Sequence, residues 1–594
     1  MRTRYWPAWS FGADWGVRLE NGNPGGQSTS AELRIPWRDW GVEPFRDAAA
    51  ASTPVFLSLQ TSWCAWCRRM EAETFADERV VDLLSERVVP VRVDAERQPH
   101  VRDRYIGSGW PTNVFLTPSG GVLWSGPFVD AEDLLAAGRA VLEAWRERGP
   151  ELEAELERRR AAVASARDRR SGSGMPRREA ADDVLTFLHQ TFDARNGGFG
   201  EAPKHPPVDA VAYLHLQEAR LGAPELGEMA DRTLDGILAG EMRDPQTGAF
   251  HRYALAEDWT HPSTERLLSV NAEIMRCFAA ASAFRGRRDW ADAATAAVAW
   301  AERALTRDDG LMAASVAADG DGRAGSRPAR DDTAFADANA TWSRCLAEAG
   351  VSLGRDDWVA RAEDLFGLIR ERFDRRGALP LHFLSPGGPE GPRGLLVDAV
   401  EILAAAISVA AASGSVSTLA YAQDLAERMR EELWRDDGFA ERAEREVPGP
   451  LGPPQRPFHE NAAAARALLG LDALAGAGGA RSQAERILAF LSPAASRYGI
   501  DGAAFALAAD EFFEPAPLAI VREATSADPS DAGRELTAVA GARPGARVWR
   551  LRENARVAGR EFESAGPAAA WVRRAGGWTG PAHTSSDLRA LLDR

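Results

Sequence analysis

The stretch Trp63-Cys64-Ala65-Trp66-Cys67 decides the fold of the first part of the chain. It follows a short apolar run at 54–59, which predicts a strand, and precedes an amphipathic stretch at 68–84, which predicts a helix. Two thiols with this spacing lie one helical turn apart and can close a small disulfide. A cysteine at the start of a helix also lies beside unpaired backbone N–H groups and the positive end of the helix dipole, which stabilise a thiolate. This order of elements therefore indicates a redox site.

A second feature, Pro111, supports this interpretation. It precedes an apolar run at 113–116, and residues 88–94 predict a central strand between the two features. Thioredoxin-like folds place a cis-proline at this point, packed against the Cys-x-x-Cys motif, and cis X–Pro bonds are rare enough to signal a specific role. A zinc site would need two further ligands nearby, whereas the next cysteine along the chain is Cys277. We therefore expect a thioredoxin-like fold.

The candidate catalytic residues are the two cysteines and their neighbours. Cys64 would attack a substrate disulfide, and Cys67 would resolve the mixed disulfide. Trp63 and Pro111 would shape and shield the site, and we expect both sulfur atoms at an exposed tip. Typical thioredoxins have a buried acid six residues before the first cysteine, but this chain has Ser58 there, so we expect slower exchange or proton transfer through water. The alternative is a vestigial pair that only packs.

The length and composition of the chain limit the classes of protein to which it can belong. The chain has 594 residues, 45% of them hydrophobic, which predicts about three or four globular domains. A net charge of −16 argues against a nucleic-acid partner, which would favour a basic face. Four cysteines are too few for a disulfide framework, and no stretch approaches the ~20 apolar residues of a membrane span. The first residues lack an apolar signal region, so we expect a cytoplasmic protein without a membrane partner, bound metal or cofactor.

Changes in composition divide the chain into parts of different fold class. A charged run at 151–170 predicts an exposed helix, and Ser-Gly-Ser-Gly at 171–174 predicts a flexible joint. The last part predicts a strand at 517–521, a helix at 534–540 and a strand at 546–551. The expected fold class is therefore multidomain, α/β followed by all-α. The predicted parts are an irregular N-terminal segment, a thioredoxin-like domain, an (α/α)6 toroid and a small C-terminal α/β region, at 1–30, 31–165, 175–510 and 511–594.

Twelve segments with apolar residues at helical spacing make up the toroid region. Alternating short and long connections suggest six hairpins that form an inner and an outer ring. An open α-solenoid is the competing arrangement, but the segments have no fixed repeat period. Long loops with aromatic and charged residues recur between alternate helices and would line one mouth of a closed barrel. The segments lie near 178–192, 207–222, 225–240, 264–285, 287–304, 331–351, 355–373, 394–413, 416–433, 459–475, 479–491 and 499–508.

Long motifs run through both modules. They lie at 64–71, 93–99, 109–118, 197–206 (GGFGEAPKHP), 250–260 (FHRYALAEDWT), 262–272, 396–398 and 457–461 (PFHEN). In these motifs the sequence resembles the thioredoxin-domain proteins related to spermatogenesis-associated protein 20, which join a thioredoxin-like module to a six-hairpin toroid of glycosidase type. The resemblance spans about residues 35–590. It implies the two-module architecture rather than a particular reaction.

The chain departs from the pattern of this family at three places. The family usually carries histidines beside its cysteines, where this chain has Ala65 and Arg68. The family's Pro-His-Phe-Glu-Lys motif is replaced by Pro-Ser-Thr-Glu-Arg at 262–266, and its frequent C-terminal cysteine pair is absent from 571–581. Roles that depend on those histidines or on a terminal thiol therefore do not carry over to this chain.

Loops at the starts of the predicted toroid helices carry a second candidate site. A carboxylate pair with tryptophan platforms suits a sugar, because carboxylates handle protons and rings stack on the sugar face. Glu265 would act with Asp398 or Glu460 as acid and base. The alternative is that these residues cap helices and form salt bridges, with Lys204 and Arg252 as partners of Glu265 and Asp398. The candidate substrate-binding residues are Lys204, Arg252, Trp259, Glu265, Asp398, His459 and Glu460.

Other motifs carry structural predictions. Asn271 and Asn461 would cap helices. The run Gly197-Gly198-Phe199-Gly200 lacks the features of a phosphate loop and predicts a tight turn. Cys277 and Cys345 lie in helical segments, and we expect both to be buried.

Three hypotheses for function follow. The first is a thioredoxin-like thiol–disulfide oxidoreductase or redox sensor that acts through Cys64 and Cys67 on protein thiols or disulfides, with a toroid that binds a substrate or partner. The second is a carbohydrate-active enzyme, an epimerase or hydrolase, that holds a small sugar-like ligand in the toroid. The third is a non-catalytic scaffold that recruits thiol-bearing clients.

Overall fold

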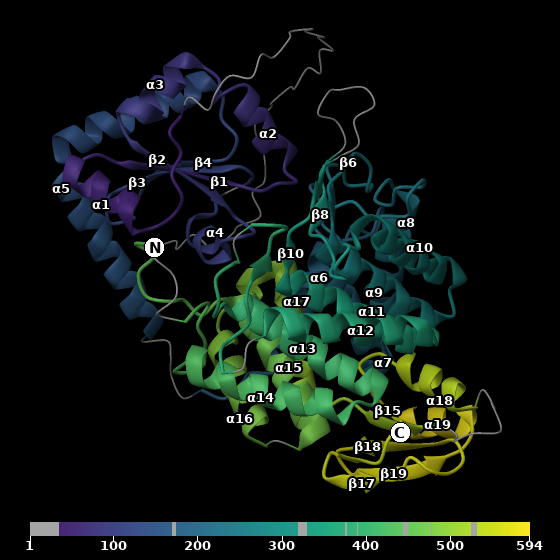
Figure 1. The fold of residues 1–594 in the computed structure, drawn as a ribbon. Helices are drawn as coiled ribbons and strands as arrows, with labels where there is room; N and C mark the ends of the chain where they lie inside the picture. The colour runs from purple at the N-terminus through teal and green to yellow at the C-terminus, as the bar shows by residue number, and fades with distance from the viewer. Residues whose placement is uncertain are drawn as a thin grey trace. The chain divides into compact units, whose positions relative to one another are not determined.

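The computed structural model describes most of the chain (Figure 1). The described residues are 35–107, 109–168, 174–318, 329–374, 377–388, 390–443, 449–476, 478–523 and 532–593. The predicted irregular segment at 1–30 and most of the predicted joint at 171–174 lie outside them. The described part divides into two compact units. The first comprises the chain up to Gln60, Trp66–Val93 and Tyr105–Arg160, and the second comprises Thr61–Ala65, Asp94–Arg104 and Ala161–Arg594.

The described residues up to Asp168 contain a four-stranded sheet and five helices. The strands have the order β2-β1-β3-β4, and β3 runs antiparallel to both β1 and β4. Phe56 and Phe115 on β1 and β3 pack with Met70, Phe75 and Val80 in the core of the first unit. The elements are β1 (Val55–Gln60), β2 (Val89–Asp94), β3 (Thr112–Leu116), β4 (Val122–Gly126), α1 (Val42–Ala51), α2 (Ala65–Ala72), α3 (Glu78–Glu86), α4 (Pro99–Tyr105) and α5 (Ala131–Asp168).

Two sequence expectations for this region concern backbone geometry. The Trp110–Pro111 peptide bond is cis, as predicted. The charged run at 151–170 was predicted to be a helix, and α5 extends through this run to Asp168. Arg148 has non-helical angles (φ −137°, ψ 22°), and Pro150 follows within the helix. Because proline lacks an N–H donor and clashes with the preceding turn, it kinks the helix here. The charged run at 151–168 is therefore a continuation of α5.

Twelve helices of the described chain, α6 to α17, form a closed double ring in the second unit. Each of α7, α9, α11 and α13 contacts the next inner helix, α15 contacts α17, and α17 returns to contact α7. Each inner helix also packs against an outer helix of its hairpin. This closure distinguishes an (α/α)6 toroid from an open solenoid, and the expected fold class is confirmed. The bounds are α6 (Glu179–Thr191), α7 (Val208–Leu221), α8 (Pro224–Ala239), α9 (Leu268–Arg285), α10 (Arg288–Leu305), α11 (Ala336–Leu353), α12 (Asp356–Phe373), α13 (Leu396–Ser413), α14 (Val416–Leu433), α15 (Phe458–Ala475), α16 (Gly478–Leu491) and α17 (Gly502–Phe513), with a 3-10 helix, η1 (Ala495–Asp501).

Glycines end five of the inner helices. Each lies directly after the last helical residue with a left-handed backbone, at φ between 64° and 75°. Glycine adopts this conformation without the steric cost of a Cβ atom, so it stops the helix and turns the chain into the next one. These positions are Gly222, Gly286, Gly354, Gly414 and Gly476.

Three asparagines in the first turns of inner helices fix the preceding loops. Asn339 Oδ1 accepts from Met312 N at 2.8 Å, and its Nδ2 donates to the carbonyls of Met312 and Phe335. Asn271 and Asn461 repeat this arrangement with Phe250 and Phe439. All three side chains are fully buried. They are therefore not N-caps, as we expected for Asn271 and Asn461, but ties between a helix and a chain segment more than twenty residues earlier.

Short strand pairs connect the helices of the toroid. Gly197, Gly198 and Gly200 have positive φ, and Phe192 bridges Phe199 across the turn that was predicted here. The strands are β5 (Tyr253–Ala254), β6 (Pro262–Ser263), β7 (Arg266–Leu267), β8 (Ser315–Val316), β9 (Arg330–Asp331), β10 (Ala334–Phe335), β11 (Phe383–Leu384), β12 (Trp434–Arg435) and β13 (Gly438–Phe439).

A small α/β region packs on the toroid at the C-terminal end, coloured yellow in Figure 1. Its sheet has the order β15-β14-β18-β19, with β14 parallel to β15 and antiparallel to β18. Contacts join β15 to α13 and α18 to α11. The two predicted strands and the predicted helix are present, and four more strands and a helix follow. The elements are β14 (Leu518–Arg522), α18 (Ala532–Gly541), β15 (Arg547–Leu551), β16 (Ala555–Val557), β17 (Arg560–Phe562), β18 (Ala569–Arg574), β19 (Gly577–Ala582) and α19 (Ser585–Asp593).

One described helix, α13, is long and apolar enough to cross a membrane, with a mean hydropathy of 1.8. Most of it (72%) is buried in the protein, where it serves as an inner helix of the toroid. Neighbouring helices cover most of the surface of an inner helix, which accounts for the high apolar content of α13.

Candidate functional site

The cysteine pair lies where the sequence predicted. Cys64 directly precedes α2, and Cys67 is the third residue of that helix. The Cys64 N–H donates to the Thr61 carbonyl at 3.4 Å. Both cysteines are present as thiols, and both residues are buried, with 2% and 3% of their surface exposed. The expectation of two sulfur atoms at an exposed tip is therefore wrong.

A neutral network occupies the place of the buried acid of typical thioredoxins. Ser58 is fully buried, and its Oγ donates to Asn113 Oδ1 at 3.1 Å. Gln60 Nε2 donates to the Ser58 hydroxyl. The Asn113 amide in turn donates to the Pro127 carbonyl at 3.0 Å. None of these groups titrates near neutral pH, so the network cannot transfer a proton as a carboxyl group would.

The side chain of Arg252 packs on the ring of Trp63, in the segment before α2. Trp63 is 4% exposed, and the Arg252 guanidinium carbon lies 4.4 Å from the centroid of its ring, within cation–π distance. The same guanidinium lies 5.4 Å from the Tyr253 ring. Arg252, a predicted substrate-binding residue, is thus part of the environment of Trp63 in the second unit.

Glu96 is a titratable group that the sequence analysis missed. Burial raises its pKa to about 8, and the negative charge of Asp94 acts in the same direction. The Trp63 side chain favours the ionised form of Glu96 but does not outweigh burial. Glu96 follows β2 by two residues, and nothing in its spacing marks it as buried. The site therefore includes one carboxyl group that can gain or lose a proton near neutral pH.

A buried histidine–aspartate pair lies at the start of α13. His382 Nδ1 is 2.9 Å from Asp398 Oδ1, and its Nε2 is 2.7 Å from the Glu96 carbonyl oxygen. Burial opposes the charge on His382, but Asp398 outweighs it and raises the pKa of His382 to about 9. Burial raises the pKa of Asp398 to about 6, although His382 acts to lower it. Both groups are therefore ionised at neutral pH. Asp398 was a predicted acid or base, but its partner is His382 and not Lys204 or Arg252.

Asp337 completes a group of three ligand-type side chains. One atom each from Asp337, His382 and Asp398 lies within 4.8 Å of the others. A histidine ligand must be neutral and offer a free nitrogen lone pair. Both ring nitrogens of His382 face oxygen acceptors, and the raised pKa of the ring favours the doubly protonated form. The donor set therefore fits an ion pair better than a metal ion.

Lys204 and Trp259 stabilise the loop that precedes α7. Lys204 Nζ donates to Asp193 Oδ2 at 2.5 Å and to the Gly197 carbonyl at 2.9 Å. The ammonium group lies 5.6 Å from the Trp259 ring centroid, and the Trp259 indole donates to the Asn196 carbonyl. Both side chains are buried, so neither presents an open surface to a sugar. The partner of Lys204 is Asp193 and not Glu265 or Asp398.

The other three candidates have different surroundings. Glu265 is 4% exposed and accepts a hydrogen bond from Ser263. His459 is exposed and packs edge-on against Phe458. Burial raises the pKa of Glu460, and the charge of Asp103 acts in the same direction. Among the described residues, no hydrogen bond or ion pair joins Glu265 to Asp398 or Glu460.

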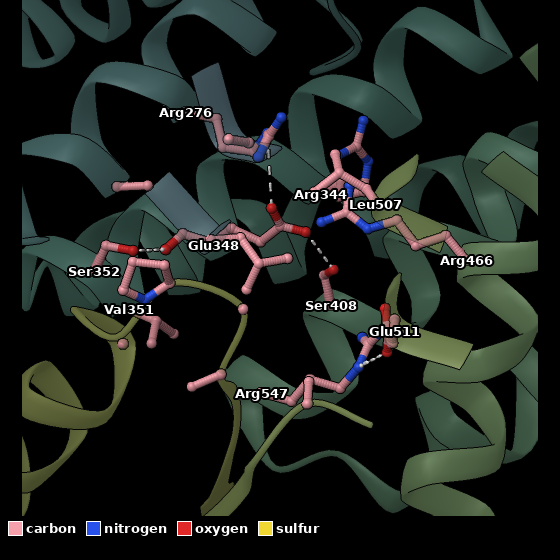
Figure 2. A pocket seen from close by; sticks show the side chains of 18 of the residues that line it. Arg276, Arg344, Glu348, Val351, Ser352, Ser408, Arg466, Leu507, Glu511 and Arg547 are labelled. Carbon is pink, nitrogen blue, oxygen red and sulfur yellow. Dashed lines mark hydrogen bonds and ion pairs between the residues drawn. The ribbon is translucent and has the colours of Figure 1, made fainter. Parts of the chain in front are cut away.

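The toroid encloses a cavity of about 380 Å³ at the centre of its inner ring (Figure 2). Its walls come from all six inner helices and from the segment at 541–548. None of the seven predicted substrate-binding residues lines it, and the described lining contains no tryptophan, tyrosine or phenylalanine. Figure 2 shows arginine and glutamate side chains reaching into the cavity from several helices. The cavity thus offers charge and small side chains instead of stacking surfaces.

Comparisons with known proteins agree with this architecture. Residues 27–164 match the family model Thioredox_DsbH, described as a protein of unknown function, DUF255. The chain is 31% identical over 315 residues to spermatogenesis-associated protein 20 of Homo sapiens, which covers 50% of this chain and 40% of that protein. The protein of the same name from Rattus norvegicus is 30% identical over 319 residues, with the same coverage. The resemblance inferred from the motifs is confirmed.

The extent of these matches is limited. The aligned region of the chain spans about 40% of the length of the curated relatives it matches. Among solved structures, a sugar epimerase from a ruminal bacterium gives a TM-score of 0.44 at 12% identity, over 55% of this chain and 85% of that chain. A cellobiose 2-epimerase from Spirochaeta thermophila DSM 6192 gives 0.42 at 17% identity, over 56% and 86%. The closed ring of helix contacts, rather than these superpositions, defines the toroid.

Proposed function

We propose that the chain is a thiol–disulfide oxidoreductase in which Cys64 is the attacking thiol. One observation carries this proposal: Cys64 directly precedes α2 and Cys67 lies one turn into it, in a region that matches a thioredoxin-like family model. The positive end of the α2 dipole stabilises a thiolate at this position.

The reaction is a two-electron exchange. The Cys64 thiolate attacks one sulfur of a substrate disulfide, forming a mixed disulfide and releasing the other substrate sulfur as a thiolate, which takes up a proton. The Cys67 thiol then loses its proton and attacks Cys64 Sγ, which releases the second substrate thiol. The substrate is reduced, and Cys64 and Cys67 are oxidised to a disulfide. An external dithiol restores the reduced pair.

Proton transfer in this reaction needs a group other than Ser58. Glu96 is the candidate, because burial raises its pKa to about 8 and the side chain of Trp63, the residue before Cys64, acts to favour its ionised form. A carboxyl group with a pKa near ambient pH is suited to general acid–base catalysis. The partners proposed for the protein are protein thiols and disulfides in a reducing compartment such as the cytoplasm.

The test uses the full chain in an insulin-reduction assay with dithiothreitol as the reductant. We expect turnover above the uncatalysed rate, and its loss in Cys64→Ser. Cys277→Ser is the matched control, because Cys277 is a buried thiol in α9, outside the motif. Equal turnover of the parent and Cys64→Ser would reject the proposal. In Cys67→Ser, Cys64 should still attack and should trap client proteins as mixed disulfides. Trapping by this variant without turnover by the parent would favour the scaffold hypothesis.

The carbohydrate hypothesis stays a prediction with less support from the geometry. Lys204, Trp259 and Asp398 are buried and engaged by Asp193, Asn196 and His382. A sugar site with ring stacking needs an accessible aromatic face, which the described lining of the cavity lacks. Sugar binding that is lost in Glu265→Gln would restore this hypothesis.

A further inference from the structure

The central cavity of the toroid is shaped for a small ligand. Its volume of about 380 Å³ lies within the range of ligand pockets, roughly 300–1,000 Å³. Alanines form much of its wall, so the backbones of the inner helices leave space at the centre. Those alanines include Ala280, Ala404, Ala463, Ala467 and Ala504.

Most charges on the wall are paired with each other. Glu273 accepts from Arg276 at 2.8 Å and from Arg344, and these two guanidinium groups lower its pKa against the effect of burial. Glu348 accepts from Ser408 at 2.7 Å and lies 3.8 Å from Arg276. These groups form a belt of alternating charge around the inner ring, in which each cation is compensated.

Arg547 and Glu511 extend the pairing toward the C-terminal region. Arg547 Nη2 lies 2.6 Å from Glu511 Oε1. Arg547 belongs to β15 and Glu511 to α17, so this ion pair ties the α/β region to the inner ring. Two further arginines of the lining, Arg220 and Arg543, form ion pairs with Asp510 and Asp593.

Arg466 differs from these arginines. It lies on α15 and lines the cavity, and among the described residues it forms no ion pair or side-chain hydrogen bond. Figure 2 shows its side chain extending into the cavity without a dashed line to any residue drawn. Burial and the charge of Arg276 lower the pKa of Arg466, although Glu511 and Asp209 act to raise it. The cation is therefore incompletely compensated by the protein.

We infer that the cavity binds a small organic anion, with a carboxylate or phosphate group held by Arg466. The planar guanidinium group can donate two parallel hydrogen bonds to either oxyanion. A bound anion would supply the negative charge that the wall does not provide at this position. Acidic side chains of the wall, such as Asp209, would accept hydrogen bonds from hydroxyl groups of the same ligand. This binding function is separate from the proposed thiol chemistry, because no cysteine of the motif lines the cavity.

Calorimetric titration of the full chain tests this inference with two probes, citrate for carboxylates and inorganic phosphate for phosphates. Ionic strength is held constant, because salt screens the attraction between an anion and Arg466. We expect saturable binding of at least one probe, and affinity reduced about tenfold or more in Arg466→Gln. Arg466→Lys keeps the charge and should retain weakened binding. Arg288→Gln is the matched control, since Arg288 is exposed on α10 and does not line the cavity.

The thermal stability of the same variants separates binding from folding. An incompletely compensated cation does not stabilise the free protein, so Arg466→Gln should melt at or above the temperature of the parent. Loss of binding with unchanged or raised melting temperature supports the inference. Equal affinity of Arg466→Gln and the parent, or no binding of either probe to the parent, would overturn it.

Discussion

His382 Nδ1 lies 2.9 Å from Asp398 Oδ1, and 0–1% of either residue is exposed. The pair joins the loop before β11 to the first turn of α13, sixteen residues later. Because two buried opposite charges compensate each other, each depends on the other for its stability in the folded state. This dependence gives the first prediction.

The two single substitutions of this pair should together cost more stability than the double substitution. We expect His382→Leu and Asp398→Ala each to lower the free energy of unfolding by about 3–5 kcal/mol, because each leaves a buried charge uncompensated. The double variant should lose clearly less than the sum. Urea unfolding of the parent, the two single variants and the double variant measures the coupling between the two residues. The Glu96 carbonyl loses its donor in both variants that lack His382, so this loss cancels in the comparison. Additive losses would show that the two charges do not interact.

Glu96 should make stability depend on pH. Its pKa is about 8 in the folded protein against 4.5 for an unperturbed glutamate, so the folded state retains a proton that the unfolded state releases. Its contribution is therefore fully present below pH 4.5 and is lost as pH rises through 8. Relative to the parent, Glu96→Gln should gain about 2 kcal/mol of stability between pH 5 and pH 7. Melting temperatures across this range measure the gain, with the exposed Glu257→Gln as the control that should show none.

The buried asparagines should be essential for the stability of the toroid. Asn339→Ala leaves the N–H and the carbonyl of Met312 buried without their partner. We expect a loss of about 3 kcal/mol or more, at roughly 1–3 kcal/mol for each unsatisfied group. Gln246→Ala removes an exposed amide side chain and should change stability by less than about 0.5 kcal/mol. A small effect of Asn339→Ala would mean that the loop relaxes and water replaces the asparagine.

The four cysteines should differ in reactivity. Burial raises the pKa of Cys277 to about 12 and raises the pKa of Cys345 well above its usual value, so both remain thiols at neutral pH. Cys64 lies at the start of α2, where a thiolate is favoured. In the native, reduced protein, mass spectrometry after timed alkylation should find Cys64 modified first. Because Cys64 is buried, we expect its labelling to be slow in absolute terms. Labelling of Cys64 no faster than that of Cys345 would contradict its role as the attacking thiol.

Much of the fold could be predicted because its signals are local. Helical spacing of apolar residues marks the toroid helices, and glycines such as Gly286 and Gly354 mark their ends. The cysteine motif and the proline before β3 identify the first sheet. Strands β16 to β19 were missed because they are short or carry many glycines and polar residues, which weakens the alternating pattern of a strand.

The candidate sites depended on long-range contacts that spacing does not encode. Asp398 was identified, but His382 lies in a loop sixteen residues earlier, and only the folded chain brings the two together. Arg466 and Glu273 are charged residues within helices that are otherwise buried on most sides. An inner helix has no face toward solvent, so a charged residue in it must face an internal cavity or a buried partner. Such a charge is the one signal in the sequence that indicates a cavity with charged walls.

The measurement that tests the central claim most directly is disulfide exchange by the full chain. Insulin reduction is followed for the parent, Cys64→Ser and Cys277→Ser at equal concentrations with dithiothreitol as the reductant. Catalysis that is lost only in Cys64→Ser is the predicted result. Rates for all three proteins that equal the uncatalysed reaction would contradict the assignment of Cys64 as an attacking thiol.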